Sequence, residues 1–244
     1  MTIIKIFLFA AILVLLPACA GNAGFLQDLQ KELEKHSSPT VPSQQQMISA
    51  MRQALEQGSE HATGSLGKPD GFLGNPKVRI PVPSPLRNIE QGMRKLGQGK
   101  MADAFIVSLN RAAERATPLA KDILLNAIRK MSVQDVVNII RGPENAATTY
   151  FRNKTTARLT TALLPIVTGA TNSVGVTRSY KNMVRQAGPL AAFVDLKQLD
   201  LDTYITRKTL DGLFLLIADE EKRIRKDPVA RSTELLKKVF GGKW

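Results

Sequence analysis

Residues 200–228 read DLDTYITRKTLDGLFLLIADEEKRIRKDP, and this stretch carries the longest helical pattern in the chain. Its apolar residues recur at the spacing of three and four that places side chains on one face of a helix. The members of this apolar stripe are Leu210, Leu213, Phe214, Ile217 and Ile224. Leu215 and Leu216 widen the stripe, so we expect the middle of the helix to be buried on more than one side. The stretch predicts the central helix of an all-α fold.

The two ends of this helix carry signals of their own. Asp200 or Asp202 is suited to cap the N-terminus, because a short side-chain oxygen accepts hydrogen bonds from the first free backbone N–H groups. Near the C-terminus, acids precede bases by four residues, which favours ion pairs along the helix surface. These pairs are Asp219 with Arg223 and Glu221 with Arg225. Pro228 then ends this helix and starts another, because proline suits the first helical position.

The rest of the chain fits a single helical domain. Hydrophobic residues make up 43% of the 244 residues, which is enough for a sizeable core, and aromatic residues make up only 5%. The spacing of apolar residues and of helix-ending residues predicts about nine or ten helices and no convincing sheet. We divide the chain into a targeting segment (1–20), a short helix with a linker (21–42) and an all-helical domain (43–244).

Local signals place several helix boundaries. Thr117-Pro118 predicts an N-cap followed by proline at the first helical position. Ser132 lies three residues before an acid, which is typical of a capping box. A short helix after Pro143 is expected to precede a separate helix over 155–174, which Pro165 should kink because proline removes a helical hydrogen bond.

Residues 67–86, GKPDGFLGNPKVRIPVPSPL, form the irregular part of the pattern. Apolar residues alternate from Val78 to Val82 as in a strand, but Pro81 and Pro83 each remove a backbone donor. We therefore expect an extended edge or a polyproline segment. A loop of this length is unusual inside a helical domain. Two interpretations stay open: a lid or binding loop, or a strap packed along helices by Phe72, Leu73, Val78 and Ile80.

The N-terminus has the pattern of an export signal. Lys5 precedes an uncharged apolar run, Ile6 to Leu16, which is shorter than a typical membrane span. Ala18-Cys19-Ala20 fits the cleavage rule for soluble export, whereas Leu16 to Cys19 also reads as a lipoprotein site at which Cys19 is acylated. We expect a periplasmic protein, soluble or anchored through Cys19, with no transmembrane helix in the mature chain.

The charge balance points to anionic partners. Lys and Arg number 34 against 21 Asp and Glu, a net charge of +13, and residues 222–244 hold eight of these bases and two of the acids. Such a field attracts lipid headgroups or other anionic components of a cell envelope, although a solvated basic surface is the alternative. The chain lacks zinc-finger spacing, an RNA-binding aromatic pattern and a basic zipper, so no nucleic-acid partner is expected.

Residues that carry chemistry are few. His36 and His61 have no carboxylate or thiol at metal-ligand spacing, so the sequence predicts no metal site and no cofactor. Glu114 or Glu220, if buried, would suit acid/base catalysis, because burial disfavours the charged form, whereas structural ion pairing is the alternative. Tyr150 next to Phe151-Arg152 offers an aromatic pair beside a cation, against the alternative of core packing. The ligand-binding candidates are Arg79, Arg111, Glu114, Tyr150, Arg152, Glu220 and Arg225.

Four stretches together resemble a bacterial family known as domain of unknown function 4197. They are GKPDGFLGNPKVRIPVP (67–83), LNRAAERA (109–116), YFRNKT (150–155) and LDGLFLLIADEEKRIRKDPVARSTELLKKVFG (210–241). The similarity covers residues 47–241. Members of the family are typically exported, often as predicted lipoproteins, so the resemblance implies export and a single domain. It brings no activity, substrate or catalytic residue.

Three functions follow as hypotheses. The first is a non-catalytic envelope protein that binds an amphipathic or anionic ligand, such as a lipid or a cell-wall fragment. It predicts a closed apolar cavity with Arg or Lys at its mouth. The second is a protein-interaction or scaffold module of the envelope, which predicts an exposed apolar patch. The third is an enzyme that uses Glu114 or Glu220 as acid or base, which requires that carboxyl group in a cleft with a perturbed pKa.

Overall fold

The computed structural model describes residues 42–189 and 199–227, together with Arg231, Thr233 and Lys237. The chain divides into residues 1–41 and 42–244, and the helices below belong to the second unit. The predictions for the targeting segment with Cys19, for the helix before residue 41 and for the helix after Pro228 lie outside the described residues.

The described residues contain helices and no strand, so the all-α prediction is confirmed. The α-helices are α2 (Gln44–Gly67), α3 (Arg87–Lys95), α4 (Gly99–Ala116), α5 (Ala120–Arg129), α6 (Val133–Arg141), α7 (Ala146–Val174), α8 (Val176–Ala187) and α9 (Leu201–Lys226). Two short 3-10 helices are η1 (Ser84–Leu86) and η2 (Thr117–Leu119). The predicted count of nine or ten is too high for this part of the chain. One reason is α7, which runs through residues 152–154 because no glycine or proline interrupts it there, and Pro165 lies inside it without ending it.

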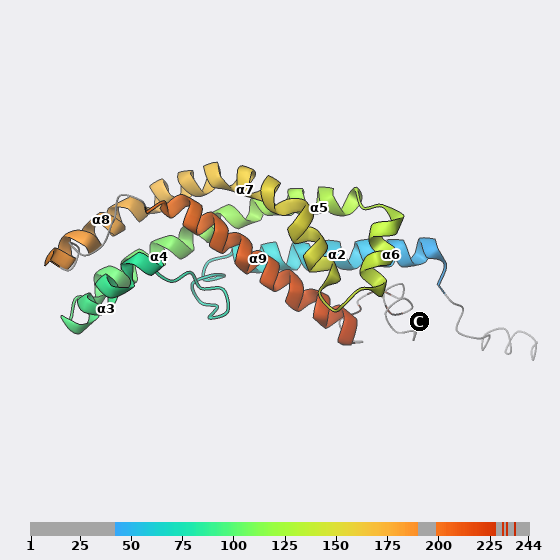
Figure 1. Cartoon of the computed structure of the whole chain (residues 1–244), viewed down its shortest axis with the longest axis horizontal. Coiled ribbons are helices and arrows are strands. Elements are labelled where there is room, and N and C mark those ends of the chain that lie inside the picture. The colour runs from blue at the N-terminus through green and yellow to red at the C-terminus, as the bar shows by residue number, and fades with distance from the viewer. Residues whose placement is uncertain (1–41, 190–198, 228–230, 232, 234–236, 238–244) are drawn as a thin grey trace, which may run out of the picture. The chain divides into compact units, whose positions relative to one another are not determined.

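Helix α9 is the central helix that the sequence predicts. It packs against α7, α2 and α4, and Figure 1 shows it running beside α7 and crossing α2. All five residues of the predicted stripe are buried. The predicted widening of the stripe is wrong for Leu215, which is 39% exposed, whereas Leu216 is half-buried. Asp200 is the N-cap, since its carboxylate accepts a hydrogen bond from the Thr203 N–H at 2.9 Å. Asp202 instead accepts hydrogen bonds from the Thr168 and Thr171 hydroxyls of α7, at 2.7 and 2.8 Å.

The predicted caps of α5 and α6 have different outcomes. The Thr117 hydroxyl donates back to the Ala113 carbonyl at 2.8 Å instead of capping the next helix. Helix α4 therefore passes through η2 into α5 without the predicted N-cap. The capping box of α6 is confirmed, because Ser132 Oγ accepts from the Asp135 N–H at 3.1 Å and the Asp135 carboxylate accepts from the Ser132 N–H at 2.9 Å.

The predicted ion pairs of α9 are half right. Glu221 pairs with Arg225 at 3.1 Å, as predicted. Asp219 does not pair with Arg223: it lies 2.8 Å from Lys77 of the 67–86 segment, which comes within reach through packing that sequence spacing does not reveal. Arg223 pairs with Glu220, one turn away on the same helix.

Residues 67–86, called the strap below, pack along α4 and α9. Phe72, Val78, Ile80 and Val82 are buried, and Leu73 is half-buried, so the strap interpretation holds and the segment is not a free lid. Gly212 of α9 makes this approach close. A Cβ at that position would lie 2.8 Å from Cε1 of the Phe72 ring, too near for any residue larger than glycine without a shift.

Candidate functional site

The predicted polar cluster on α4 holds the strap in place. The Asn110 side chain accepts a hydrogen bond from the Ile80 N–H at 2.8 Å and donates one to the Ile80 carbonyl at 2.9 Å. Glu114 accepts from the N–H groups of Phe72 and Leu73 at 3.1 and 3.2 Å. Both side chains are buried. They satisfy backbone groups that an extended segment buried among helices would otherwise leave unpaired.

Arg111 completes this cluster. Its guanidinium donates to Glu114 at 2.6 Å and to Asp70 of the strap at 2.8 Å. Both oxygens of the Glu114 carboxylate therefore already accept hydrogen bonds, from the strap on one side and from Arg111 on the other. The geometry gives Arg111 and Glu114 a structural role at this position.

Glu220 occupies a similar structural position between α2 and α9. Its carboxylate lies 2.7 Å from His61 Nδ1 of α2 and accepts from Arg223 Nε at 3.0 Å. The Glu220 side chain is 10% exposed, while those of its partners His61 and Arg223 are 58% and 51% exposed. This buried carboxylate links two helices.

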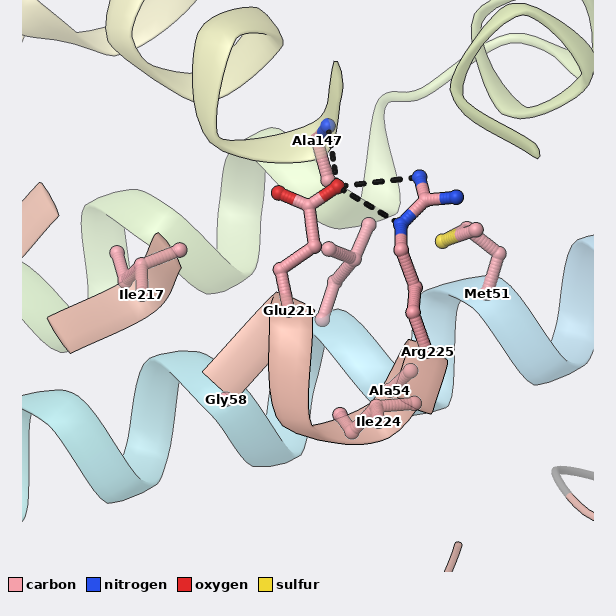
Figure 2. Close-up of a pocket in the computed structure, with 9 residues that line it drawn as sticks. Met51, Ala54, Gly58, Ala147, Ile217, Glu221, Ile224 and Arg225 are labelled. Atoms are coloured by element: carbon pink, nitrogen blue, oxygen red, sulfur yellow. Dashed lines mark hydrogen bonds and ion pairs between the residues drawn. The ribbon is translucent and has the colours of Figure 1, made fainter. Parts of the chain in front are cut away.

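Glu221 is a buried carboxylate whose role the sequence did not reveal. Its Oε1 accepts from the Ala147 N–H at 2.9 Å, and its Oε2 accepts from the Thr148 N–H and hydroxyl at 2.9 and 2.8 Å. Arg225 donates to Oε1 at 3.1 Å (Figure 2). It also donates to the Ile139 carbonyl at 2.8 Å. The first N–H groups of a helix have no partner within it, so Glu221 is an N-cap that α9 supplies to α7.

The pocket beside Glu221 is apolar but very small. Its walls come from α2 and α9, with Met51, Ala54 and Ile217 among them (Figure 2). The free volume is about 20 Å³, which is room for about one water molecule. This pocket does not supply the predicted closed cavity, because an acyl chain does not fit. Arg225, at its edge, is committed to Glu221.

A larger and open groove lies between α7 and α9, with a volume of about 250 Å³. We call it the α7/α9 groove. Its apolar wall is made by Leu164, Leu210 and Phe214, and its two cations are Arg152 and Arg207. On α7 the lining side chains repeat every four residues from Arg152 to Leu164. On α9 they form two such series, from Thr203 to Asp211 and from Thr206 to Phe214, because this spacing keeps residues on one helix face. The groove is thus a direct product of how the two helices pack.

The chemistry of the groove is mixed. The Arg152 guanidinium lies over the Phe214 ring, 4.7 Å from its centroid, and 3.7 Å from the Asp211 carboxylate. The Thr206 hydroxyl is buried and has no hydrogen-bond partner. Thr209, one turn away, instead donates back to a carbonyl of its own helix at 2.8 Å. The groove therefore offers a cation on an aromatic surface, an apolar wall and an uncommitted hydroxyl.

Tyr150 and Arg152, predicted together, do not share a site. Residues two positions apart on a helix are rotated by more than half a turn, so Tyr150 and Arg152 point to different sides of α7. Arg152 reaches Phe214, whereas the Tyr150 ring lies 5.9 Å from the Lys154 ammonium. Burial and the neighbouring Asp135 raise the pKa of the Tyr150 hydroxyl. An aromatic ring therefore lies beside a cation in two places, Phe214 with Arg152 and Tyr150 with Lys154, and neither pair is adjacent in the sequence.

Arg79, the remaining candidate, is exposed on the strap. It lines a small hollow of about 130 Å³ with Lys77, Lys208 and Asp211. Apart from Arg111 and Glu114, which bond to each other, the predicted candidates thus fall in separate places. Arg152 alone lies in the α7/α9 groove, and Arg207, Thr206 and Phe214 were missed there. A spacing of four links Thr206 with Leu210 and Phe214, and Arg207 with Asp211, which indicates that each series lies along one side of α9. This spacing does not reveal which side of α9 meets α7.

The chain was compared with known protein families. Residues 41–241 match the model of the family described as Protein of unknown function (DUF4197). The chain belongs to this family. The resemblance seen in the sequence is therefore confirmed, and the match spans α2 to α9, with the strap and the α7/α9 groove inside it. No curated protein and no solved structure matches the chain.

Two further findings concern the same described residues. No helix among them is by itself long and apolar enough to span a membrane. Only α7 and α8, which meet at a 60° bend, reach that length and composition when taken together. Within this part of the chain, no group of three or more His, Cys, Asp and Glu side chains is arranged to hold a metal ion.

Proposed function

We propose that this protein is a non-catalytic binding protein for an amphipathic anion, with the α7/α9 groove as its site. The observation that carries the proposal is the combination, in one groove, of an apolar wall, two arginines and the unpaired Thr206 hydroxyl. An amphipathic acid has the matching parts. Its hydrocarbon would contact Leu210 and Phe214, and its acid group would accept hydrogen bonds from Arg152 and Arg207.

Physical chemistry supports this class of ligand. A guanidinium binds a carboxylate or phosphate through two parallel hydrogen bonds, which are stronger than neutral ones. Arg152 meets Asp211 only at 3.7 Å, so a ligand acid can replace a loose contact with a closer one. The groove's volume of about 250 Å³ lies just below the usual range for ligand sites, about 300–1,000 Å³. A short acid, or one end of a longer chain, is therefore the expected occupant.

The two carboxylates considered for catalysis already have structural hydrogen-bond partners, which favours a binding protein over an acid/base enzyme. Glu114 is bonded to the strap and to Arg111, and Glu220 is bonded to His61 and Arg223. Neither lines the α7/α9 groove.

The cell envelope is the place we propose for this activity. The support is the export pattern of residues 1–20, followed by the basic composition of the chain. Anionic amphiphiles are components of envelope membranes, so a protein sent there meets this ligand class. Whether Cys19 anchors the protein does not change the chemistry of the groove.

Calorimetric titration with decanoate tests the proposal. Arg152→Gln/Arg207→Gln removes both cations of the groove, and we expect it to weaken binding by about tenfold or more, since each charged hydrogen bond contributes about 1.5–3 kcal/mol. The matched control is Arg178→Gln/Arg185→Gln, which removes two exposed arginines of α8. Decanol, which has the same chain and no charge, should bind more weakly than decanoate. Equal decanoate affinity in the two double variants would contradict the proposal.

A further inference from the structure

A second hollow lies on a different face of α7 from the groove, where α7 packs against α5 and α6. Its volume is about 270 Å³. Ile123 and Ala127 of α5 form its apolar side. Its polar side consists of Lys130, Asp135, Tyr150, Lys154, Thr155 and Arg158. The hollow is therefore built from residues 123–158, where the three successive helices α5, α6 and α7 meet.

Among the described residues, none of the three cations in this hollow forms an ion pair, although the charge of Lys154 interacts with that of Asp135. Among the described residues, the salt bridges of α7 involve Arg152 only, and neither Lys130, Lys154 nor Arg158 forms one. Lys154 and Arg158 are four residues apart on the same helix, a spacing at which like charges repel each other. The Lys154 ammonium lies 5.9 Å from the centroid of the Tyr150 ring. An anion in the hollow would relieve this repulsion.

Asp135, the one acid among the residues that line the hollow, already has hydrogen-bond partners. Its carboxylate accepts from the Ser132 N–H and hydroxyl at 2.9 and 2.7 Å, as part of the α6 capping box, and it bonds to the Tyr150 hydroxyl. The Ser132 hydrogen bonds keep the pKa of Asp135 below its usual value, so this group stays ionised. The three cations and this single carboxylate leave the hollow with a net positive charge.

We propose that this hollow binds a phosphate group carried as a monoester. A phosphomonoester carries close to two negative charges at neutral pH, which matches the uncompensated charge. The guanidinium of Arg158 can bind two phosphate oxygens at once, and Lys130 and Lys154 act as point charges beside it. The apolar side, Ile123 and Ala127, contacts the group that bears the phosphate. The inference is independent of the α7/α9 groove, because the two sites share no residue.

Titration of the full chain with inorganic phosphate, followed by backbone amide NMR at constant ionic strength, tests the site. We expect saturable shifts at Lys154 and Arg158, and binding about tenfold weaker or more in Lys154→Gln/Arg158→Gln. The matched control, Arg129→Gln/Arg141→Gln, removes two exposed arginines of α5 and α6 outside the hollow. The charge-preserving variant Lys154→Arg/Arg158→Lys should bind phosphate nearly as well as the natural chain. This separates loss of charge from damage to the fold.

A second arm identifies the source of the phosphate. Vesicles of phosphatidylcholine with phosphatidic acid present the group on a lipid, and vesicles of phosphatidylcholine alone do not. Stronger binding to the vesicles with phosphatidic acid, lost in Lys154→Gln/Arg158→Gln, assigns the site to a lipid headgroup. Saturable binding of inorganic phosphate with no preference for these vesicles assigns the site to a soluble ligand. Shifts spread evenly over exposed basic residues, or equal affinity in the variant and its control, would overturn the proposal.

Discussion

Glu221 shows how a single buried carboxylate can hold two helices together. It bonds the first N–H groups of α7 and the Arg225 guanidinium, and its side chain is 5% exposed. We predict that Glu221→Ala lowers the free energy of unfolding by about 3–5 kcal/mol, because it leaves Arg225 without its acid and the α7 N-terminus without its cap. Urea unfolding followed by circular dichroism measures this.

Asp219→Ala is the matched control for that prediction. Asp219 lies on the same helix, but its ion pair with Lys77 is exposed, with side chains 47% and 65% accessible. The expected loss is below about 1 kcal/mol, since exposed ion pairs contribute little. Similar losses in the two variants would show that Glu221 is not the cap.

Asp200 gives the fold a defined dependence on pH. Hydrogen bonds from Thr203 hold the pKa of Asp200 below its usual value in the folded protein. A carboxyl group with a lowered folded-state pKa stabilises the fold above its unfolded pKa, about 4, and this contribution is lost as pH falls through the folded value. We predict that Asp200→Asn, which still caps a helix, loses less stability than the natural chain between about pH 6 and about pH 3. Chemical denaturation across this range checks it, and parallel curves would contradict it.

At this scale, the sequence predicts residues whose role is local. The Asp200 cap, the Ser132 capping box and the α9 stripe all depend on spacing within one helix, and all three are confirmed. Glu114, Glu220 and Glu221 could not be assigned in the same way. Their partners come from other elements, so only the packed structure shows that these charges are buried and bonded.

The strap packs against both α4 and α9. Gly212→Ala would bring a methyl group to 2.8 Å from the buried Phe72 ring, whereas Gly64→Ala on α2 meets nothing within 4 Å. We predict opposite effects on stability. Gly64→Ala should raise the melting temperature, because alanine favours a helix over glycine by about 1 kcal/mol. Gly212→Ala should lower it despite the same gain, because overpacking costs about 1–3 kcal/mol. A higher melting temperature for both variants would show that the strap does not pack tightly on α9.

Asn110 provides an independent test of the same element. Asn110→Leu removes both hydrogen bonds to Ile80 and leaves its buried N–H and carbonyl unpaired. The expected loss is about 1–3 kcal/mol for each unpaired group, with faster tryptic cleavage at Lys77 and Arg79. Unchanged cleavage there would mean that the strap is held mainly by its apolar side chains.

The elements themselves were predictable to different degrees. Helix α9 could be read from periodicity, because one face meets the core along most of its length. The segment 143–174 was predicted as two helices but contains the single helix α7 (Ala146–Val174), because a change in the apolar pattern does not interrupt a helix without a residue that breaks it. The strap was recognised as irregular, but its two interpretations differ only in burial, which depends on Gly212 and Asn110 elsewhere in the chain.

On the scale of the whole unit, the sites arise between helices. The α7/α9 groove needs Arg152 and Arg207 from helices about fifty residues apart in sequence to face each other. The sequence identified Arg152 and the need for an apolar surface beside a cation, but it predicted a closed cavity. The structure instead offers open hollows on either helix face, because α7 is covered by α9 on one side and by α5 and α6 on another. The spacing of apolar residues predicts where the helices lie in the sequence. Which side chains meet between two helices depends on how the helices are rotated against each other.

Intermolecular NOE measurement between decanoate and the methyl groups of the protein tests the central claim most directly. We predict contacts from the decanoate chain to the methyl groups of Leu164 and Leu210, together with shifts of the Arg152 and Arg207 side-chain resonances. The same contacts should disappear in Arg152→Gln/Arg207→Gln and persist in Arg178→Gln/Arg185→Gln. Contacts to scattered exposed methyl groups, such as those of Leu96 and Leu119, with none in the α7/α9 groove, would contradict the account.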